Sequence, residues 1–294
     1  MCKNKGLILV NAFSRTQIDS AMRLQEEFQK KGVAVFTQRN NEFHSWIKNG
    51  TCFLSNFPYQ FCLFYDQDFY AGKILEKAGV LLFNPISAIE KCADKMLTHI
   101  ELANNGIAMP DTIPGLWCYS HEGTYSKQQI DCVINRLGLP LVAKLCYGSS
   151  GDGVFLIQDR NELSDFCKKY ILDHFLFQKF INSSYGKDIR VLVIAQKYVG
   201  AMLRENKNDF RSNIARNGVG SVFDLDDKGK HLCEKIASIL DLDYCGIDLL
   251  VDKEGGYLVA EVNSNAFFTE FEKVTGINVA EKYVNHILNH IDGI

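Results

Sequence analysis

The chain has 294 residues, of which 47% are hydrophobic and 23% charged, with a formal net charge of -3. This length exceeds the usual size of one hydrophobic core and predicts at least two lobes. The small net charge gives no sign of a general nucleic-acid or membrane binder, and no apolar run approaches the ~20 residues of a membrane span. The first apolar stretch, Leu7–Val10, is too short for a secretory leader. We therefore expect a cytoplasmic protein with neither nucleic acid nor membrane as a partner.

The first ~85 residues predict a small α/β unit. The expected strands cover 6–10, 33–37, 61–65 and 80–83, and an amphipathic helix is expected at about 16–31, closed by Gly32. Strands that alternate with helices favour a parallel sheet. We expect an N-terminal α/β domain over residues 1–88.

The middle of the chain predicts a compact lobe over 89–175. A helix is expected from Asp94 through Asn105, followed by the stop signals Gly106 and Pro110. The expected elements after it are a helix at about 126–137, a strand at 140–146, a glycine-rich turn at 148–153, a strand at 154–157 and a helix at 160–170.

The last part, 176–294, predicts an antiparallel sheet with helices on one side. Its expected elements are strands at 175–181, 188–195 and 197–204, a helix at 227–240, a hairpin near 245–263 and a helix at 277–290. Neighbouring strands without intervening helices favour antiparallel pairing.

The hairpin carries two carboxylates and an amide: Asp248, Glu261 and Asn263. If its turn is centred between Glu254 and Gly255, Asp248 lies opposite Glu261, and Asn263 shares the face of Glu261. Opposed like charges are destabilising, so a cation is expected between them, and oxygen ligands suit Mg²⁺. The alternatives are that the carboxylates are solvated or paired with Lys or Arg, or that a one-residue bulge turns Asp248 away.

Basic residues supply a second half for such a site. Lys144 lies inside an apolar strand just before a loop of three glycines and two serines, whose backbone N–H groups can approach an anion. Alone, this is equally compatible with an ordinary hairpin loop and an edge lysine. Arginine suits a bidentate grip on phosphate or carboxylate, although each of Arg190, Arg204 and Arg211 could singly be a surface charge. Together these residues predict an Mg²⁺–nucleotide site.

The order of these motifs resembles the ATP-grasp superfamily, most closely its RimK-type branch of glutamate and amino-acid ligases. The resemblance covers about 84–290, and residues 1–83 are similar to the preceding α/β domain of the family. The matching stretches are 93–97, 102–107, 140–154, 177–181, 187–193, 209–213, 246–248, 261–263 and 275–277. The resemblance implies an α/β protein with an ATP-grasp fold behind an N-terminal parallel α/β pre-grasp domain.

The resemblance also implies roles for individual residues. Lys95 and Lys144 would touch nucleotide phosphates, and the loop 148–153, with Gly151 and Gly153, would be the flap over them. The other nucleotide-binding residues implied are Gln178, Lys179, Phe180 and Ile181 at the hinge that reads adenine, Asp188 near the ribose, and Arg211, Ser212 and Asn213. Asp248, Glu261 and Asn263 would hold magnesium. Arg190, Arg204 and Arg211 would be the catalytic cations that face the phosphates or an acyl phosphate.

The implied reaction joins a carboxylate to an amine at the expense of ATP, through an acyl phosphate, with one or two Mg²⁺ ions or with Mn²⁺ in their place. The favoured amine is glutamate, and the acceptor bears a carboxylate, as a small molecule, a peptide or a protein C-terminus does. Phosphoryl transfer needs positioning and charge neutralisation rather than a nucleophilic side chain. The open alternatives are another amino acid, a nucleotide-binding regulatory protein without ligation, and a small-molecule kinase. A homo-oligomer is also compatible with the sequence.

Two departures from the family pattern affect different parts of this reading. Lys179 stands where the hinge commonly carries an acidic residue, which leaves a backbone contact with adenine intact. Residues 264–268 replace a small residue followed by Pro after the metal-binding Asn, next to the acceptor region. This second departure leaves the substrate open rather than the use of ATP.

Overall fold

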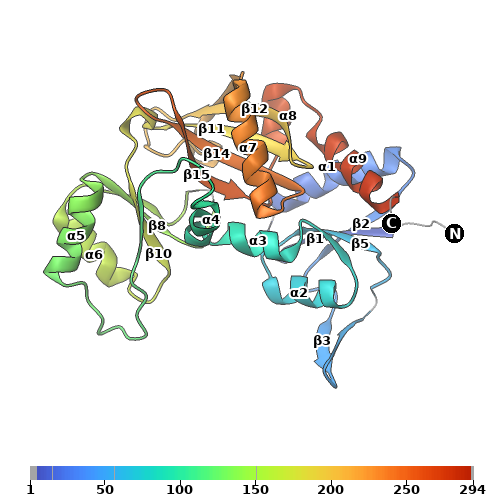
Figure 1. The fold of residues 1–294 in the computed structure, drawn as a ribbon. Coiled ribbons are helices and arrows are strands. Elements are labelled where there is room, and N and C mark those ends of the chain that lie inside the picture. The colour runs from blue at the N-terminus through green and yellow to red at the C-terminus, as the bar shows by residue number, and fades with distance from the viewer. Residues whose placement is uncertain (1–4, 15, 56, 150, 293–294) are drawn as a thin grey trace.

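A computed structural model describes residues 5–14, 16–55, 57–149 and 151–292. These residues form three bodies, each built on its own sheet (Figure 1). The ends of the expected domains at 1–4 and 293–294 lie outside the described residues. Among the described helices, none is long and apolar enough to cross a membrane.

The first body contains the expected parallel sheet. Its elements are β1 (Lys5–Val10), α1 (Thr16–Lys30), β2 (Ala34–Arg39), β5 (Phe61–Tyr65), α2 (Phe69–Lys77) and β6 (Leu81–Phe83). The strands lie in the order β2-β1-β5-β6, and every pairing is parallel. Both faces are buried: Ile8 and Val10 enter one core, whereas Leu7 and Leu9 enter another on the opposite face. The apolar runs at 6–10 and 61–65 therefore predicted these strands correctly.

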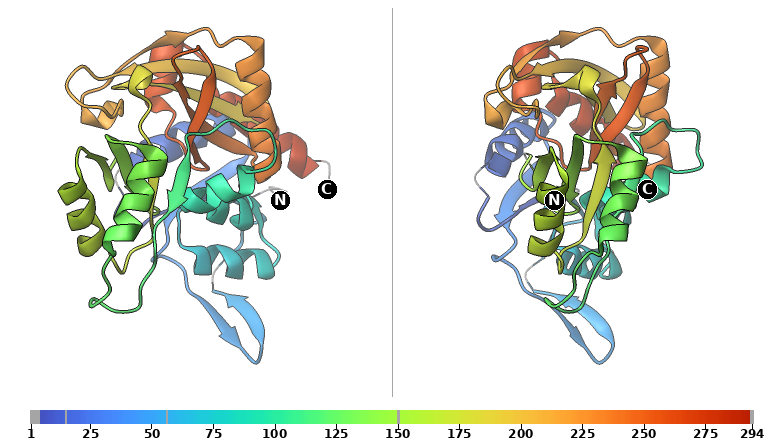
Figure 2. Two further views of the ribbon diagram at one scale, coloured as in Figure 1. Left: turned by 60° about the vertical axis from the view of Figure 1, so that its left-hand side comes forward. Right: turned by 90° about the vertical axis from the view of Figure 1, so that its left-hand side faces the viewer.

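Two features of this body were not predicted. The first is the helix α2: Gly72 lies inside it and weakens the helical pattern of its sequence, although the side chain of Asp68 caps its N-terminus. The strands β3 (Ser45–Lys48) and β4 (Thr51–Leu54) form an antiparallel hairpin that projects from the body (Figures 1 and 2). These strands are too short to stand out in a pattern of alternating residues.

The second body is the central lobe. Helices α3 (Ile86–Ala93) and α4 (Lys95–Leu102) lead into it, with Asp94 capping α4. The lobe itself consists of β7 (Thr112–Pro114), α5 (Lys127–Leu137), β8 (Leu141–Leu145), β9 (Val154–Ile157), α6 (Arg160–Lys169) and β10 (Phe175–Lys179). Its sheet has the order β7-β10-β8-β9. The domain boundaries at 88/89 and 175/176 stay predictions; β10 begins at the second of them and pairs with β7 and β8.

The third body is an antiparallel sheet, as expected, but the strand expected at 175–181 belongs to the central lobe, and helices pack on both faces of the sheet rather than on one side. Its elements are β11 (Lys187–Ile194), β12 (Lys197–Glu205), β13 (Val219–Phe223), α7 (Asp227–Leu240), β14 (Tyr244–Val251), β15 (Tyr257–Asn263), α8 (Thr269–Thr275) and α9 (Val279–Asp292), with short 3-10 turns at Asn182–Ser184 and Ile214–Arg216. The order is β13-β12-β11-β14-β15. Helix α7 packs on one face, where Val191 and Ile247 are buried. The opposite face carries Asp188, Arg190 and Asp248, as alternation along a strand requires.

The register of the acidic hairpin differs from the prediction near its turn. Asp248 lies opposite Glu261 as expected, but Leu249 pairs with Val259, so Ala260 is an extra residue on β15. The turn is therefore not centred between Glu254 and Gly255. The bulge does not turn Asp248 away. Because Val259 is buried in the core, an unbroken strand would have sent Glu261 to the core as well; the bulge returns it to the face of Asp248.

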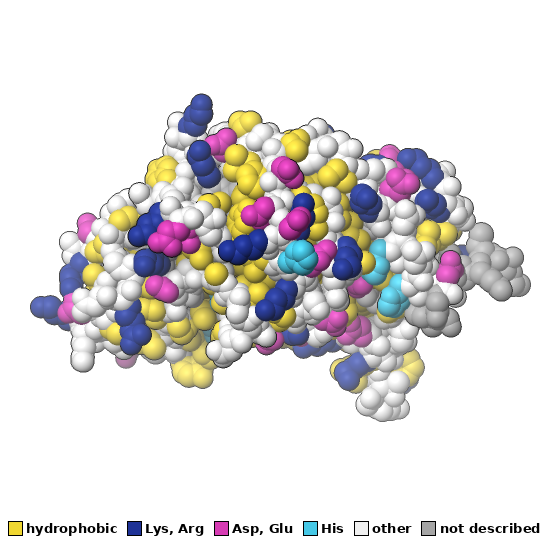
Figure 3. Space-filling model, turned by 45° about the horizontal axis from the view of Figure 1, so that its top comes forward, with side chains coloured by type: hydrophobic (Ala, Val, Ile, Leu, Met, Phe, Trp, Pro, Cys, Tyr) yellow, Lys and Arg dark blue, Asp and Glu magenta, His cyan; other side chains and the backbone are white. Residues whose placement is uncertain are grey.

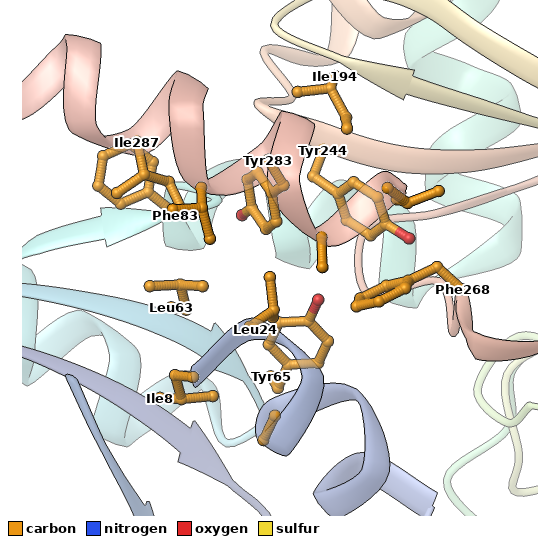
Figure 4. Close-up of a cluster of buried hydrophobic side chains, with 14 of the residues drawn as sticks. Ile8, Leu24, Leu63, Tyr65, Phe83, Ile194, Tyr244, Phe268, Tyr283 and Ile287 are labelled. Atoms are coloured by element: carbon orange, nitrogen blue, oxygen red, sulfur yellow. The ribbon is translucent and has the colours of Figure 1, made fainter. Parts of the chain in front are cut away.

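The first and third bodies share one hydrophobic core. Figure 4 shows Ile8, Leu24 and Leu63 of the first body facing Tyr244 and residues of α9. Tyr244 and Tyr283 stack with their ring centroids 4.9 Å apart. The last helix of the chain thus completes the core of the N-terminal sheet.

The surface carries no segregated charge on the face drawn in Figure 3, where Lys and Arg side chains are interspersed with Asp and Glu side chains. This agrees with the small net charge of the chain.

Candidate active site

Two cavities meet between the three bodies. The first, of about 110 Å³, lies between the sheets of the central lobe and the C-terminal lobe, and the second, of about 580 Å³, lies between the C-terminal sheet and the N-terminal body. Glu261 and Asn213 line both. The predicted site residues in the first are Lys144, Gly151, Gln178, Lys179, Phe180, Ile181, Asp188, Arg211, Ser212, Asn213, Asp248 and Glu261. Those in the second are Lys95, Arg190, Arg204, Asn213, Glu261 and Asn263.

Gly153 is the predicted site residue that lines neither cavity. Its carbonyl accepts a hydrogen bond from the backbone N–H of Leu145 at 2.8 Å, and its φ of +73° suits glycine. Gly153 therefore closes the hairpin between β8 and β9 below the flap.

Two arginines and two aspartates form a buried cluster on the C-terminal sheet. Arg190 holds both carboxylate oxygens of Asp248, through a very short bond from Nε and a 2.8 Å bond from Nη2. Arg204 binds Asp188 at 2.6 and 2.7 Å and reaches Asp248 at 3.0 Å. Burial opposes ionisation of both Asp248 and Arg204, but their opposite charges outweigh it, lowering the pKa of Asp248 and raising the pKa of Arg204. The cation expected beside Asp248 is thus an arginine pair.

The two lysines face a single carboxylate. Nζ of Lys95 donates to the carbonyl of Gly148 at 2.8 Å and lies 3.7 Å from Oε1 of Glu261. Within the described part of the chain, the ammonium of Lys144 forms neither a hydrogen bond nor a salt bridge. Burial lowers the pKa of Lys144 to about 8, and Lys95 adds to this against the attraction of Glu261 and Asp248. Because Arg190 and Arg204 are matched by Asp188 and Asp248, the lysines leave a net positive wall that suits an anion.

The glycine loop is closed over the first cavity. Nη1 of Arg211 donates to the carbonyls of Gly151 at 3.2 Å and Val154 at 3.3 Å, and Arg216 binds the Asp152 carboxylate. Ser150, part of the predicted flap, lies outside the described residues. The two anchoring arginines come from the segment 209–216, so the flap spans from the central lobe to the C-terminal lobe. A small first cavity follows from this closure.

The hinge segment lines the first cavity, but its Gln178 side chain points into the central lobe. Its Nε2 donates to Thr112 Oγ1 at 3.0 Å and lies 3.1 Å from His99 Nε2. Burial, with a smaller effect of Lys144, lowers the pKa of His99 to about 4, so the ring is neutral near pH 7. The N–H of Lys179 donates to the carbonyl of Asp111 at 2.9 Å. Any backbone contact with adenine would therefore use other groups of this segment.

Of the three predicted metal ligands, two have oxygen atoms available for a hard cation such as Mg²⁺. Glu261 has its one salt bridge to a described residue at 3.7 Å, with Lys95. The amide nitrogen of Asn263 is buried without a hydrogen-bond partner among the described residues. Asp248 has most of its lone pairs occupied by arginine. Glu261 and Asn263 thus fit Mg²⁺, which prefers one or two carboxylates together with phosphate oxygens, and Asp248 is the weaker candidate.

The sequence prediction missed the N-terminal side of the second cavity. Asn11, Tyr65 and Asp66 line it. Tyr65 is the last residue of β5, and Asn11 and Asp66 directly follow β1 and β5 at their carboxyl ends, where ligands of open parallel sheets commonly bind. A polar residue directly after each apolar run was the available signal.

Comparison with known proteins identifies the family of the chain. Residues 92–287 match the family model of the RimK-like ATP-grasp domain. The chain is 35% identical over 228 residues to β-citrylglutamate synthase B of Danio rerio, covering 76% of this chain and 54% of that protein. It is 37% identical over 218 residues to N-acetylaspartylglutamate synthase A of Homo sapiens, covering 73% and 54%. The chain thus spans about half the length of these curated relatives.

A solved structure shows the same fold over nearly the whole chain. The D-alanine–D-alanine ligase of Bacillus anthracis complexed with ATP matches with a TM-score of 0.72 and 18% identity, covering 97% of this chain and 96% of that chain. The fold expected from the sequence, an ATP-grasp fold behind an α/β domain with a parallel sheet, is confirmed. The resemblance to the RimK-type branch is confirmed by the domain match and by the synthases. The chain belongs to the RimK-like ATP-grasp family.

Proposed function

We propose that the chain is an ATP- and Mg²⁺-dependent ligase that joins a carboxylate to the amino group of an amino acid, with glutamate as the favoured amine. The observation that carries this proposal is the pairing of two lysines with oxygen donors where the two cavities meet: Lys144 lines the first, Lys95 the second, and Glu261 both. Lys144 is a cation without a hydrogen-bond partner among the described residues, and Glu261 faces it beneath the glycine loop. Cations for phosphate and oxygens for a metal are the two parts that phosphoryl transfer requires.

In this proposal, the protein binds and orients the substrates and shields the acyl phosphate from water. Lys95 and Lys144 neutralise the phosphates, while Arg190 and Arg204, paired with Asp248 and Asp188, line the second cavity with guanidinium groups that could also orient an acyl phosphate. A bound Mg²⁺, held by Glu261 and Asn263, would supply charge neutralisation at the transferred phosphoryl group. A substrate carboxylate oxygen attacks the γ-phosphorus and ADP leaves; the amine then attacks the acyl carbon and phosphate leaves. The closed loop would exclude water that could hydrolyse the acyl phosphate.

The relatives support glutamate as the amine more strongly than they support any acyl donor. Their names share glutamate and differ in the other part, citryl in one and N-acetylaspartyl in the other. Both are synthases, which favours ligation over a purely regulatory role. We propose a small carboxylate as the acyl donor, a cytoplasmic location because the reaction consumes ATP, and either one or two metal ions.

The test is ADP release and product mass with Mg-ATP, glutamate and a panel of carboxylates that includes citrate and N-acetylaspartate. We expect ADP release that depends on both substrates and a product with the mass of their amide. Glu261→Gln should lower this rate by at least about 100-fold through loss of the metal. Glu254→Gln is the matched control, because that side chain is 80% exposed at the hairpin turn.

Two results would count against ligation, and a third against the metal site. A phosphorylated product that accumulates and is not consumed by amines indicates a kinase. Tight ATP binding without turnover on the full panel indicates a regulatory protein. A Glu261→Gln variant with the wild-type rate removes the proposed metal site.

A further inference from the structure

Unsatisfied polar atoms gather at the second cavity. Among the described residues, the buried side-chain atoms without a hydrogen-bond partner are Ser20 Oγ, Gln38 Oε1, Tyr65 Oη, Asp66 Oδ2 and Asn263 Nδ2. The last three belong to residues that line this cavity. Buried polar groups are nearly always paired, so a concentration of unpaired ones along one cavity indicates a polar ligand that completes them.

Of these three residues, Asp66 has the greatest need for a partner, because its side chain is a carboxylate. The residue is 3% exposed, and its Oδ1 accepts bonds from the Gln67 N–H at 2.7 Å and from Asn11 Nδ2 at 3.2 Å. Oδ2 has no partner, and no described Lys, Arg or His forms a salt bridge with this carboxylate. A buried carboxylate is costly unless a cation or several donors compensate it.

The position of Asp66 in the fold is itself one where ligands bind. The chain runs from β1 outward to β2 and then returns to β5 on the other side of β1, so β1 and β5 flank the point at which strand order reverses. Asn11 follows β1, Asp66 follows β5, and their side chains bridge this point. In open parallel sheets, ligands bind outside the carboxyl ends of the strands at this reversal.

The cations of the cavity wall are already matched. Arg190 and Arg204 pair with Asp248 and Asp188, and Lys95 faces Glu261. The missing partner of Asp66 is therefore a cationic donor brought by the ligand.

We propose that Asp66 binds the protonated amino group of the amino-acid substrate, with Asn11 fixing the carboxylate. The proposal rests on the proposed function in one respect, namely that the second cavity takes an amino acid. It assigns the amine end of that substrate to the N-terminal side of the second cavity, where the ammonium is held before it loses a proton and attacks the acyl carbon. Asp66 is thus a binding and specificity residue for the amine.

The test compares an amino acid with its analogue that lacks the amino group. The probes are glutamate and glutarate, titrated calorimetrically into the protein with Mg-ADP. Wild type should bind glutamate at least about tenfold more tightly than glutarate, because one charge-assisted hydrogen bond is lost. Asp66→Asn should lose about 10- to 100-fold in glutamate affinity, with glutarate and ADP affinities unchanged. Asp19→Asn is the control, since it removes an exposed negative charge from the same cavity wall.

Each other outcome overturns the proposal. These are equal binding of glutamate and glutarate by wild type, wild-type glutamate affinity in Asp66→Asn, and no binding by any of the twenty amino acids. If Asp66→Asn does not fold, the wild-type comparison across amino acids and their des-amino analogues decides. Because these are equilibrium measurements, an Asp66-dependent preference for the amine would survive a failure to detect ligation, so the two proposals can fail separately.

Discussion

At the residue scale, the site is a balance of buried charges. Spacing along the chain located the lysines, the carboxylates and the glycine loop, because each belongs to a local pattern. It did not reveal that Arg190 binds Asp248, since these residues meet only through the pairing of β11 with β14. Asp66 was missed for the same reason: its missing partner is evident only when the strands are placed.

The lowered pKa of Lys144 gives nucleotide binding a pH dependence. Lys144 is cationic below its pKa of about 8 and neutral above it, so the affinity for ADP should fall as the pH rises from 7 to 9. Lys144→Met should weaken binding by about 10- to 100-fold at pH 7 and remove much of this dependence.

Calorimetric titration of ADP at several pH values checks this expectation. Lys253→Met, whose side chain is 86% exposed, should behave as the wild type and reports titration of the nucleotide itself. A pH profile of Lys144→Met that is parallel to the wild-type profile would contradict the role of Lys144.

At the element scale, two backbone irregularities position the site. The bulge at Ala260 brings Glu261 to the face of Asp248, and the loop between β8 and β9 reaches the segment 209–216. Apolar periodicity predicted the strands on both sides of each irregularity. It could not predict the bulge, because Val259 and Val262 are both apolar and three residues apart. In an unbroken strand only one of them could face the core, and the sequence does not tell which.

The loop closure predicts a specific effect of Gly151→Ala. At a φ of +76°, an added Cβ would lie 2.8 Å from Asn213 Oδ1 and 3.0 Å from Arg216 Nε. The methyl group should hinder closure and raise the KM for ATP by about three- to tenfold. Gly50→Ala is the matched control, since Gly50 has a φ of +75° with no atom within 4 Å of the added Cβ.

Steady-state kinetics and urea unfolding of both variants distinguish strain of the backbone from obstruction of loop closure. The left-handed backbone should cost both variants about 1–2 kcal/mol of stability, whereas KM should change in Gly151→Ala alone. An unchanged KM in Gly151→Ala would show that closure over this segment is not needed for ATP binding.

At the scale of the whole molecule, the N-terminal body is tied to the end of the chain. Helix α9 packs into the core of the first sheet, and Arg23 of α1 binds Glu27, Glu272 and Asn278. The expectation of three successive units did not contain this closure. Sequence patterns report which face of a helix is apolar, but not which sheet that face meets.

The Arg23 network predicts a stability effect that depends on pH. Burial raises the pKa of Glu27, but bonds from Lys30, Arg23 and Asn278 outweigh it and lower the pKa to about 2. The stabilisation from this carboxylate is therefore present above its usual pKa of 4.5 and is lost as the pH falls toward 2. Arg23→Met should lower the free energy of unfolding by about 1–3 kcal/mol at pH 7 and by less at pH 3.

Urea unfolding at the two pH values measures this difference. Arg136→Met, on the exposed side of α5, should stay within about 0.5 kcal/mol of the wild type. A destabilisation by Arg23→Met that is equal at both pH values would attribute the effect to packing rather than to charge.

The most direct test of the central claim follows oxygen from the carboxylate. Citrate and N-acetylaspartate labelled with ¹⁸O in their carboxyl groups are incubated with glutamate, Mg-ATP and the protein, and the phosphate and nucleotide products are analysed by mass spectrometry. Attack on the γ-phosphorus followed by amide formation predicts ADP, one ¹⁸O atom in each phosphate released, and an amide of glutamate. Label in AMP, or unlabelled phosphate without amide, would contradict an acyl-phosphate ligase.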